Sequence, residues 1–287
     1  MRNDLKEIVE QLAVRGFRTA GGAQWKEVMH LMQNLITRYI SPPDIQSWKD
    51  EHGVEYRNFS CIFQGESSKK IVVGAHYDSF EETPGADDNA SAVAVLLCLG
   101  ELIRTGKNLP FTVELVFYAC EEPPFYGTEG MGSFHHAKMC DKDNTELMIC
   151  LEMVGFFSDE KGSQDYPIFP LRWLYGSKAN YLMVVSNIKS VKLLNRYWNV
   201  LNPSTLLYKR FISPFKSYGL DWSDHRNYWS KNIPAIMITD TSIFRNKNYH
   251  QLSDTSDTLD YDKMEVLTKD LAKLLTCKSS KEIGGHN

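Results

Sequence analysis

Acidic and histidine side chains follow the apolar runs of this sequence, at the points where the runs end. The run IVVGA is followed by His76 and Asp78. The run VELVFYAC is followed by Glu121 and Glu122, and the run LMICL by Glu152. Because ligands of open α/β sheets bind beyond the carboxyl ends of the strands, we expect these side chains to lie close together. Histidine and carboxylate groups without thiolates favour zinc, cobalt or manganese, so the sequence predicts a metal site at this edge.

Glu152 stands inside an otherwise apolar segment. Residues 148–151 precede it, and Met153 and Val154 follow it. Burying an unpaired carboxylate there would be costly, so this group must be neutralised, paired or bound to a metal. The surrounding candidates are acids rather than Arg or Lys, which makes a metal cation the favoured counter-charge.

Other strand-end and helix-start residues have ordinary structural explanations. Asp240 follows the run PAIMIT, and a structural hydrogen bond is the favoured interpretation for it. Asp88 or Asn89 can cap the helix that is expected to start near Ala90. Only the convergence of several such residues on one edge argues for chemistry.

The elements that must position these residues are short β-rich runs alternating with amphipathic helices. Helical spacing predicts two opening helices at 4–13 and 24–40. Beyond them the pattern predicts strands at 56–63, 70–75, 112–120, 147–154, 181–186 and 235–239, and helices at 90–105, 132–139, 189–200, 223–229 and 263–276. The near-continuous apolar strands indicate an α/β sheet covered by helices on both faces.

A single domain is expected over residues 1–278, with the opening helices packed on it and a frayed tail at 279–287. The 287 residues are enough to bury a core without disulfides. The six cysteines show no C-x-x-C pairing and are expected to be mostly buried free thiols. The aromatic segment 159–179 is expected to be a long surface excursion.

The charge balance argues against two classes of partner. The chain has 32 Lys and Arg against 36 Asp and Glu, a formal charge of −4, and no basic block. Neither nucleic acid nor an anionic membrane surface is therefore expected as a partner. The first residues lack the apolar core of a signal peptide, so a cytoplasmic location is expected for the chain as written, with secretion open if a leader was removed.

Five motifs give the sequence a family resemblance. They are VVGAHYDS, PGADDNASA, EE, LEMVGF and YHQLSDTSDTLDY, in this order. Together they closely resemble the co-catalytic zinc exopeptidases of the aminopeptidase Y and bacterial leucyl aminopeptidase type, over residues 57–275. The resemblance implies a mixed, mostly parallel sheet between helices, two zinc ions at the strand ends, and removal of the N-terminal residue of peptides.

The resemblance also implies which residues bind the metals. The terminal ligands would be His76 and Glu152 for one zinc ion, and Glu122 and His250 for the other. Asp87 would bridge the two ions.

Two further residues would support the ligands. Asp78 would orient the imidazole of His76 and raise its basicity. Glu121 would be the general base, accepting a proton from the activated water and passing it to the departing amine. The family also implies a cis peptide bond between Asp87 and Asp88.

Specificity cannot be copied from the family. The loop at 123–130 is longer and more aromatic than in relatives and could wall the substrate pocket. Asp224 and His225, in the run DWSDHRNYW, resemble the segment near the amino end of the substrate, with helix capping as the alternative interpretation. His135 and His136 are adjacent on a helix and are expected at the surface.

Three other functions stay open. Glutaminyl cyclases share the fold but use one zinc ion, so metal stoichiometry and release of a free amino acid would discriminate them. A metal-free binding module of the same fold is disfavoured by the retention of every implied ligand and of Glu121. An amino-sugar or N-acyl amidohydrolase is open because the metal core is indifferent to what flanks the carbonyl.

Overall fold

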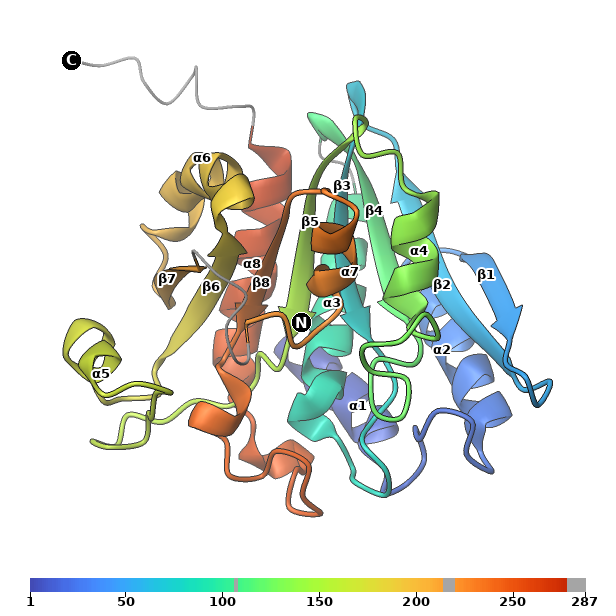
Figure 1. Ribbon diagram of the computed structural model, residues 1–287, viewed down its shortest axis with the longest axis horizontal. Helices are drawn as coiled ribbons and strands as arrows, with labels where there is room; N and C mark the ends of the chain where they lie inside the picture. Colours follow the sequence, from blue (N-terminus) through green and yellow to red (C-terminus); the bar gives the residue numbers. More distant parts are fainter. Residues whose placement is uncertain (106–107, 214–219, 278–287) are drawn as a thin grey trace.

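All strands in the described part of the chain belong to one mixed sheet, shown in the computed structural model of Figure 1. The structure describes residues 1–105, 108–213 and 220–277. The strands are β1 Asp44–Lys49, β2 Glu55–Phe63, β3 Ser67–His76, β4 Phe111–Tyr118, β5 Thr145–Glu152, β6 Tyr181–Asn187, β7 Leu207–Ser213 and β8 Ala235–Thr239. Their order is β1-β2-β4-β3-β5-β8-β6-β7. The central strands β4, β3, β5 and β8 run parallel, which brings their carboxyl ends to one edge.

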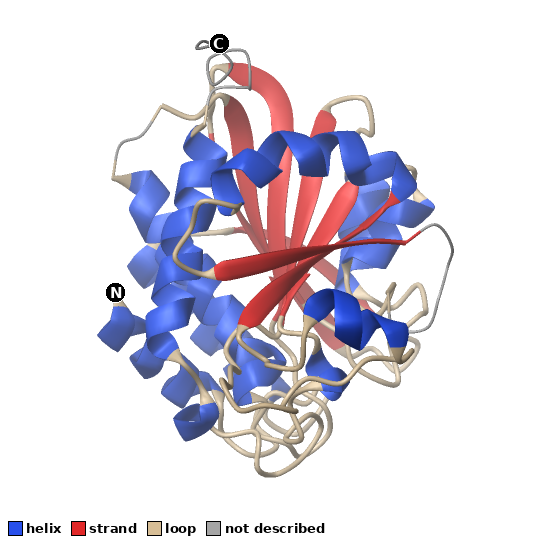
Figure 2. Ribbon diagram, turned by 90° about the vertical axis from the view of Figure 1, so that its left-hand side faces the viewer, coloured by secondary structure: helices blue, strands red, loops and turns tan. Residues whose placement is uncertain are grey.

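Helices cover both faces of this sheet (Figure 2). They are α1 Arg2–Leu12, α2 Trp25–Tyr39, α3 Ala92–Arg104, α4 Gly132–Met139, α5 Pro170–Tyr175, α6 Val191–Leu201, α7 His225–Ser230 and α8 Tyr261–Thr276. One face packs on α1, α2, α3, α6 and α8, and the other on α4 and α7. This is the mixed, mostly parallel sheet between helices that the sequence predicted.

Alternation along the strands explains the two layers. In β3, Ile71 and Val73 belong to the first hydrophobic layer and Val72 to the second. In β5, Ile149 and Met148 divide in the same way. Because successive side chains of a strand point to opposite faces, a strand covered on both sides needs apolar side chains on both of its faces. The same apolar runs carry the polar residues at their ends to one edge.

Three of the α-helices and strands named above were not expected from the sequence. Two of them, β1 and β7, form the edges of the sheet, and their sequences DIQSWK and LYKRFIS mix charged with apolar residues. The third, α5, lies inside the aromatic excursion expected at 159–179. The expected tail at 279–287 lies outside the described residues, and the domain boundary at residue 278 stays a prediction.

Four cysteines, Cys61, Cys98, Cys120 and Cys150, are buried thiols, as the sequence predicted for most of them. None of the described helices is long enough and apolar enough to span a membrane.

The prediction that His135 and His136 are both surface residues is wrong for His136. His136 lies on the buried face of α4. Its Nδ1 is 2.6 Å from the hydroxyl of Tyr228, and its Nε2 is 3.3 Å from Oε1 of Glu114. His135 is half-buried and stacks on Trp48 at a centroid distance of 4.3 Å. The buried carboxylate of Glu114, on β4, thus gives α4 a polar contact on its buried face. The pattern of the helix sequence alone does not reveal such a contact.

Substitution His136→Gln is expected to remove a pH dependence of stability. Burial alone would lower the pKa of His136, but the Cys140 thiol and the Glu114 carboxylate raise it from 6.5 to about 9. The charged imidazole therefore stabilises the fold fully below pH 6.5, and this contribution is lost as pH rises through 9. Between about pH 6 and about pH 10, the wild-type free energy of unfolding should fall by about 3 kcal/mol relative to the variant. Urea unfolding of metal-free protein measures this difference.

The control for this measurement is His135→Gln. Burial lowers the pKa of His135, so its removal should not reproduce the loss between neutral and alkaline pH. Parallel curves of stability against pH for the wild type and His136→Gln would contradict the assignment.

Candidate metal centre

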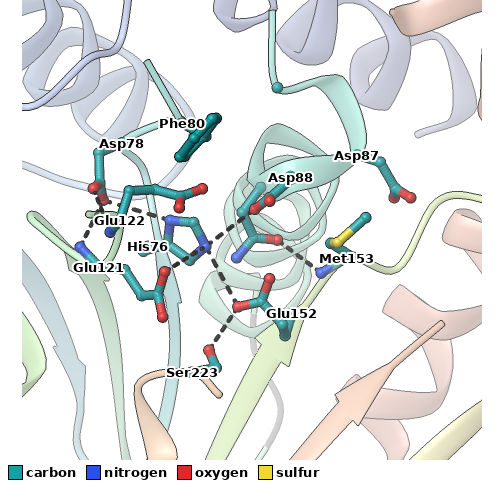
Figure 3. A network of polar contacts seen from close by, with 12 residues as sticks. His76, Asp78, Phe80, Asp87, Asp88, Glu121, Glu122, Glu152, Met153 and Ser223 are labelled. Carbon is teal, nitrogen blue, oxygen red and sulfur yellow. Dashed lines mark hydrogen bonds and ion pairs between the residues drawn. The ribbon is translucent and has the colours of Figure 1, made fainter. Parts of the chain in front are cut away.

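The side chains singled out at the strand ends converge at one edge of the sheet (Figure 3). His76 is the last residue of β3 and Glu152 the last residue of β5. Glu121 and Glu122 follow β4, which pairs in parallel with β3. Asp88 reaches the same place from the turn Ala86–Ser91 that leads into α3.

These residues form two groups that could each hold a metal ion. In the first, Nε2 of His76 lies 3.4 Å from Oδ1 of Asp88 and 3.4 Å from Oε2 of Glu152. In the second, Nε2 of His250 lies 3.2 Å from Oδ2 of Asp88 and 3.3 Å from Oε2 of Glu122. Asp88 belongs to both groups and offers one carboxylate oxygen to each. A single carboxylate therefore joins the two groups.

Several atoms of the two groups are buried without a hydrogen-bond partner among the described residues. They are both ring nitrogens of His76, Oδ1 of Asp88, Oε1 of Glu122 and Nε2 of His250. Buried polar atoms of this kind are costly unless something satisfies them. Their donor types, imidazole nitrogen and carboxylate oxygen, are those that zinc accepts. The residues therefore fit a pair of zinc ions.

The structure does not place Asp87 between the two groups, where the family resemblance implied it. Asp87 belongs to neither group of described residues, and Figure 3 shows its side chain turned away from the other carboxylates. Its Oδ1 accepts from the amide of Gly155 at 2.9 Å, and its Oδ2 from Nδ2 of Asn246 at 2.7 Å. The cis peptide bond likewise joins Asp88 and Asn89, rather than Asp87 and Asp88. Adjacent residues point in different directions, and the motif DD alone does not say which one faces the metals.

Asp78 lies where it can orient both groups. Its Oδ1 is 3.4 Å from Nδ1 of His76. The two carboxylate oxygens also accept the backbone amides of Glu121 and Glu122, at 3.1 and 3.0 Å. A single buried carboxylate thus lies within ion-pair distance of one imidazole and fixes the backbone of both glutamates.

Glu121 belongs to neither group but lies beside the first. Its Oε2 is 3.9 Å from Nε2 of His76. Burial, together with the charges of Glu122 and Glu152, raises the pKa of Glu121 well above its ordinary value, although His76 opposes the shift. A carboxyl group with this raised proton affinity can take a proton from a neighbouring water molecule.

His250 is held by two aromatic rings. Its imidazole stacks on Phe80 and on Tyr249, at centroid distances of 3.9 and 3.8 Å. Burial opposes protonation, but the carboxylates of Asp88 and Glu122 raise the pKa of His250 to about 10. In the metal-free protein a proton therefore competes for the position that a metal ion would take.

Three positioning residues were not found from the sequence. Ser223 donates its hydroxyl to Oε2 of Glu152 at 2.6 Å. Asn89 ties the turn to β5 through the carbonyl of Leu151 and the amide of Met153. The third, Asp254, accepts the backbone amides of Asp87 and Asp88 at 2.9 and 3.1 Å. Asp254 lies in the motif YHQLSDTSDTLDY, so its position was visible, but its role needed the structure.

A cavity of about 660 Å³ opens beside the two groups. One end is lined by Asp88, Glu121, Glu122, Glu152 and His250. The remaining wall is mainly apolar and comes from the loop after Glu122, the excursion that contains α5, and strands β6 to β8; it includes Pro123, Tyr126, Ile168, Leu171, Met183, Val185, Phe211 and Met237. The aromatic loop at 123–130 therefore contributes to the wall, as the sequence suggested.

The structure does not support direct substrate contact by Asp224 and His225. Both side chains are completely buried, and neither is among the described residues that line the cavity. Nε2 of His225 donates to the carbonyl of Leu220 at 2.8 Å. Asp224 precedes α7, but in the described chain its side chain makes no capping hydrogen bond. Asp240 takes part in a structural hydrogen bond, as expected: its Oδ1 accepts from the amide of Ser242 at 2.7 Å.

The sequence matches the family model described as peptidase family M28 over residues 58–275. An Escherichia coli (strain K12) protein, "Uncharacterized protein YfbL", is 40% identical over 233 residues, which are 78% of this chain and 71% of the relative. A "Probable leucine aminopeptidase" of Trichophyton verrucosum is 24% identical over 72% of this chain, which spans only 53% of that relative. The resemblance inferred from the sequence motifs is confirmed by these matches.

Solved structures share the fold. The Legionella pneumophila LapA aminopeptidase superposes with a TM-score of 0.72 at 17% identity, covering 96% of this chain and 70% of that one. A glutaminyl cyclase of Tannerella forsythia superposes with a TM-score of 0.68 at 19% identity, covering 97% of this chain and 99% of that one. At such identities the likeness establishes the fold alone, and it does not distinguish the two activities.

Proposed function

Because this chain belongs to peptidase family M28, we propose that it is a zinc-dependent aminopeptidase that uses two metal ions. The enzyme class predicted from the sequence, a metallopeptidase, agrees with that family. The observation that carries the proposal is Asp88, whose two carboxylate oxygens each face a separate group of histidine and glutamate.

Each zinc ion would be held by three residues of this chain. His76, Asp88 and Glu152 would hold one, and Asp88, Glu122 and His250 the other. When bound, such a pair activates a water molecule and polarises the carbonyl of the scissile bond. Asp78 would keep the imidazole of His76 in the tautomer that presents Nε2 to the metal.

Glu121 would act as the general base. It lines the cavity next to the metal groups, yet it is not needed as a ligand. Its carboxylate would take the proton of the attacking water and give it to the departing amino group. Burial raises the pKa of Glu121, which strengthens it as a base.

The cavity would take the side chain of the N-terminal residue. Its wall is mainly apolar, so we expect large apolar residues such as Leu, Met or Phe to be preferred over Gly or Asp by about 10- to 200-fold in kcat/KM. A panel of aminoacyl p-nitroanilides measures this ratio. A preference for charged N-terminal residues would contradict it.

Helix α5 offers a matched pair of variants for this test. Leu171 lines the cavity, whereas Leu174 is 71% exposed and is not among the described lining residues. Leu171→Ala should lower kcat/KM for a leucyl substrate, and Leu174→Ala should leave it unchanged. Equal effects of the two substitutions would mean that α5 does not contribute to specificity.

Chelation tests the proposed reaction. Removal of metal should abolish the release of a free amino acid from a peptide, and added zinc should restore it. A peptide with an acetylated N-terminus should not be cleaved, because an aminopeptidase requires the free amine. Hydrolysis that survives chelation would overturn the proposal.

Glutaminyl cyclase activity is the second candidate, because a glutaminyl cyclase shares the fold over 97% of this chain. The two activities differ in their products. A cyclase would convert an N-terminal glutamine to pyroglutamate and release ammonia without shortening the peptide. The two groups of candidate ligands support the peptidase.

A further inference from the structure

The Arg18 side chain lies completely buried in the segment between α1 and α2, and its guanidinium group is saturated by backbone carbonyls. An arginine side chain has five N–H donors. Here they meet five carbonyl oxygens, those of Leu12, Tyr77, Asp78, Pro84 and Gly85. Such complete pairing uses the planar fork of an arginine and cannot be reproduced by the single ammonium group of a lysine.

Four of these carbonyls belong to the two segments that carry metal-binding residues. Tyr77 and Asp78 directly follow His76 at the end of β3, and Nη1 of Arg18 donates to their carbonyls at 2.8 and 3.4 Å. Nη2 donates to the carbonyls of residues 84 and 85, which lead into the turn that carries Asp88. One guanidinium group thus joins the backbone next to His76 to the backbone that precedes Asp88.

The packing around Gly85 shows how tightly this turn lies on Arg18. Gly85 has a φ of +61°, and a Cβ atom placed there would lie 2.6 Å from Nη2 of Arg18 and 2.3 Å from the carbonyl oxygen of Asp88. Within the turn, the amides of Asp87 and Asp88 donate to the carboxylate of Asp254. A buried cation therefore holds the carbonyls that lead into this turn, and a buried carboxylate holds two amides within it.

The positive charge of Arg18 acts against the binding of a metal cation. A favourable effect of Arg18 on metal binding must therefore come from the position in which it holds the backbone. Burial lowers the pKa of Arg18 to about 10, against the opposing effect of Asp78 and Asp88, and the group stays positively charged at neutral pH. A buried cation next to the site repels a divalent ion. If charge dominated, removing it would strengthen zinc binding; if position dominated, removing it would weaken zinc binding.

We propose that Arg18 is a positioning residue of the metal centre, which holds His76 and the turn of Asp88 in the arrangement that binds zinc. The inference rests on the proposed two-metal function. Arg18 lies outside residues 58–275, the part of the chain that matches the family model. A positioning role of Arg18 would make the segment between α1 and α2 part of the active centre.

The test is a competition titration of metal-free protein with zinc alone, against a chromophoric chelator. The variants are Arg18→Met, which removes charge and donors, and Arg18→Lys, which keeps the charge and loses the fork. Leu5→Ala is the matched control, because Leu5 is completely buried in α1 and Arg18 makes no described hydrogen bond to it. Thermal melting of each metal-free variant separates loss of stability from loss of zinc affinity.

Both Arg18 variants should bind zinc about 10- to 100-fold more weakly than the wild type, the usual effect of losing a residue that orients metal ligands. Leu5→Ala should melt at a lower temperature and keep wild-type zinc affinity. If Arg18→Met does not fold, Arg18→Lys alone decides.

Wild-type or tighter zinc binding by Arg18→Lys would overturn the inference, as would tighter binding by Arg18→Met. An equal loss of zinc affinity in Leu5→Ala would also overturn it, since any destabilisation of this region would then suffice. A wild-type protein that binds no zinc would instead overturn the proposed function, and the inference with it.

Discussion

Substituting Glu121 by Gln is expected to lower kcat by about 10²- to 10⁴-fold, the contribution of a well-placed general base. The amide keeps the shape of the side chain but cannot accept the proton of the attacking water. Glu121 belongs to neither ligand group of the described residues, so the variant should still bind zinc as the wild type does. Steady-state kinetics and metal analysis of the same sample measure the two effects.

The matched control is Glu122→Gln, one residue along the chain. Glu122 belongs to the second group, with its Oε2 3.3 Å from Nε2 of His250, so this variant should lose metal as well as activity. Near-normal turnover by Glu121→Gln would refute the general-base role. Loss of zinc in Glu121→Gln would instead make Glu121 a ligand.

Substituting Asp88 by Asn is expected to weaken the binding of both zinc ions by more than about 100-fold, since it removes a direct ligand rather than a residue that orients one. One carboxylate oxygen of Asp88 belongs to the group of His76 and the other to the group of His250. No other described residue belongs to both groups, so none can replace Asp88. Zinc titration of the metal-free variant, followed by a peptide hydrolysis assay, measures the loss.

Asp87→Asn provides the sharpest comparison, because the family resemblance implied Asp87 as the bridging residue. Its carboxylate accepts from Gly155 and Asn246 and faces away from the metal groups. The amide can accept fewer hydrogen bonds, so stability should fall by about 1–3 kcal/mol while zinc affinity stays within a few-fold of the wild type. If Asp87→Asn lost both ions and Asp88→Asn kept them, the bridging assignment would be reversed.

The edge of the sheet that carries the site could be predicted because the apolar runs in the sequence show where the buried strands end. His76 and Glu152 are the last residues of β3 and β5, and each is preceded by an apolar run. A buried parallel strand needs such a run, and its end marks where polar side chains can gather. Residues at these positions could therefore be singled out from the sequence once an α/β sheet was expected.

Residues placed by turns could not be assigned in the same way. The choice between Asp87 and Asp88 depends on the backbone of the turn, in which Asp88 and Asn89 adopt non-helical dihedral angles. Adjacent aspartates in a sequence carry no information about which one faces the metals. The resemblance to a family located the motif, but of its two aspartates the structure places Asp88, rather than Asp87, in both groups.

Buried polar residues away from the strand ends were also beyond the sequence. Arg18 lies in a connection between helices, and its carbonyl partners are up to 67 residues away along the chain. His136 and Glu114 come from α4 and β4, which pack together only in the folded protein. Long-range polar pairs of this kind leave no periodic pattern, because their partners depend on tertiary packing.

A titration of metal-free protein with zinc, with bound metal and the amino acid released from a leucyl peptide measured together, tests the two-metal aminopeptidase most directly. Two equivalents of zinc should bind, one per ligand group, and release of leucine should appear with them and disappear on chelation. Binding of a single equivalent, with ammonia released from an N-terminal glutamine and no leucine from the peptide, would contradict the assignment and favour the cyclase. Leucine release by the metal-free protein would contradict both.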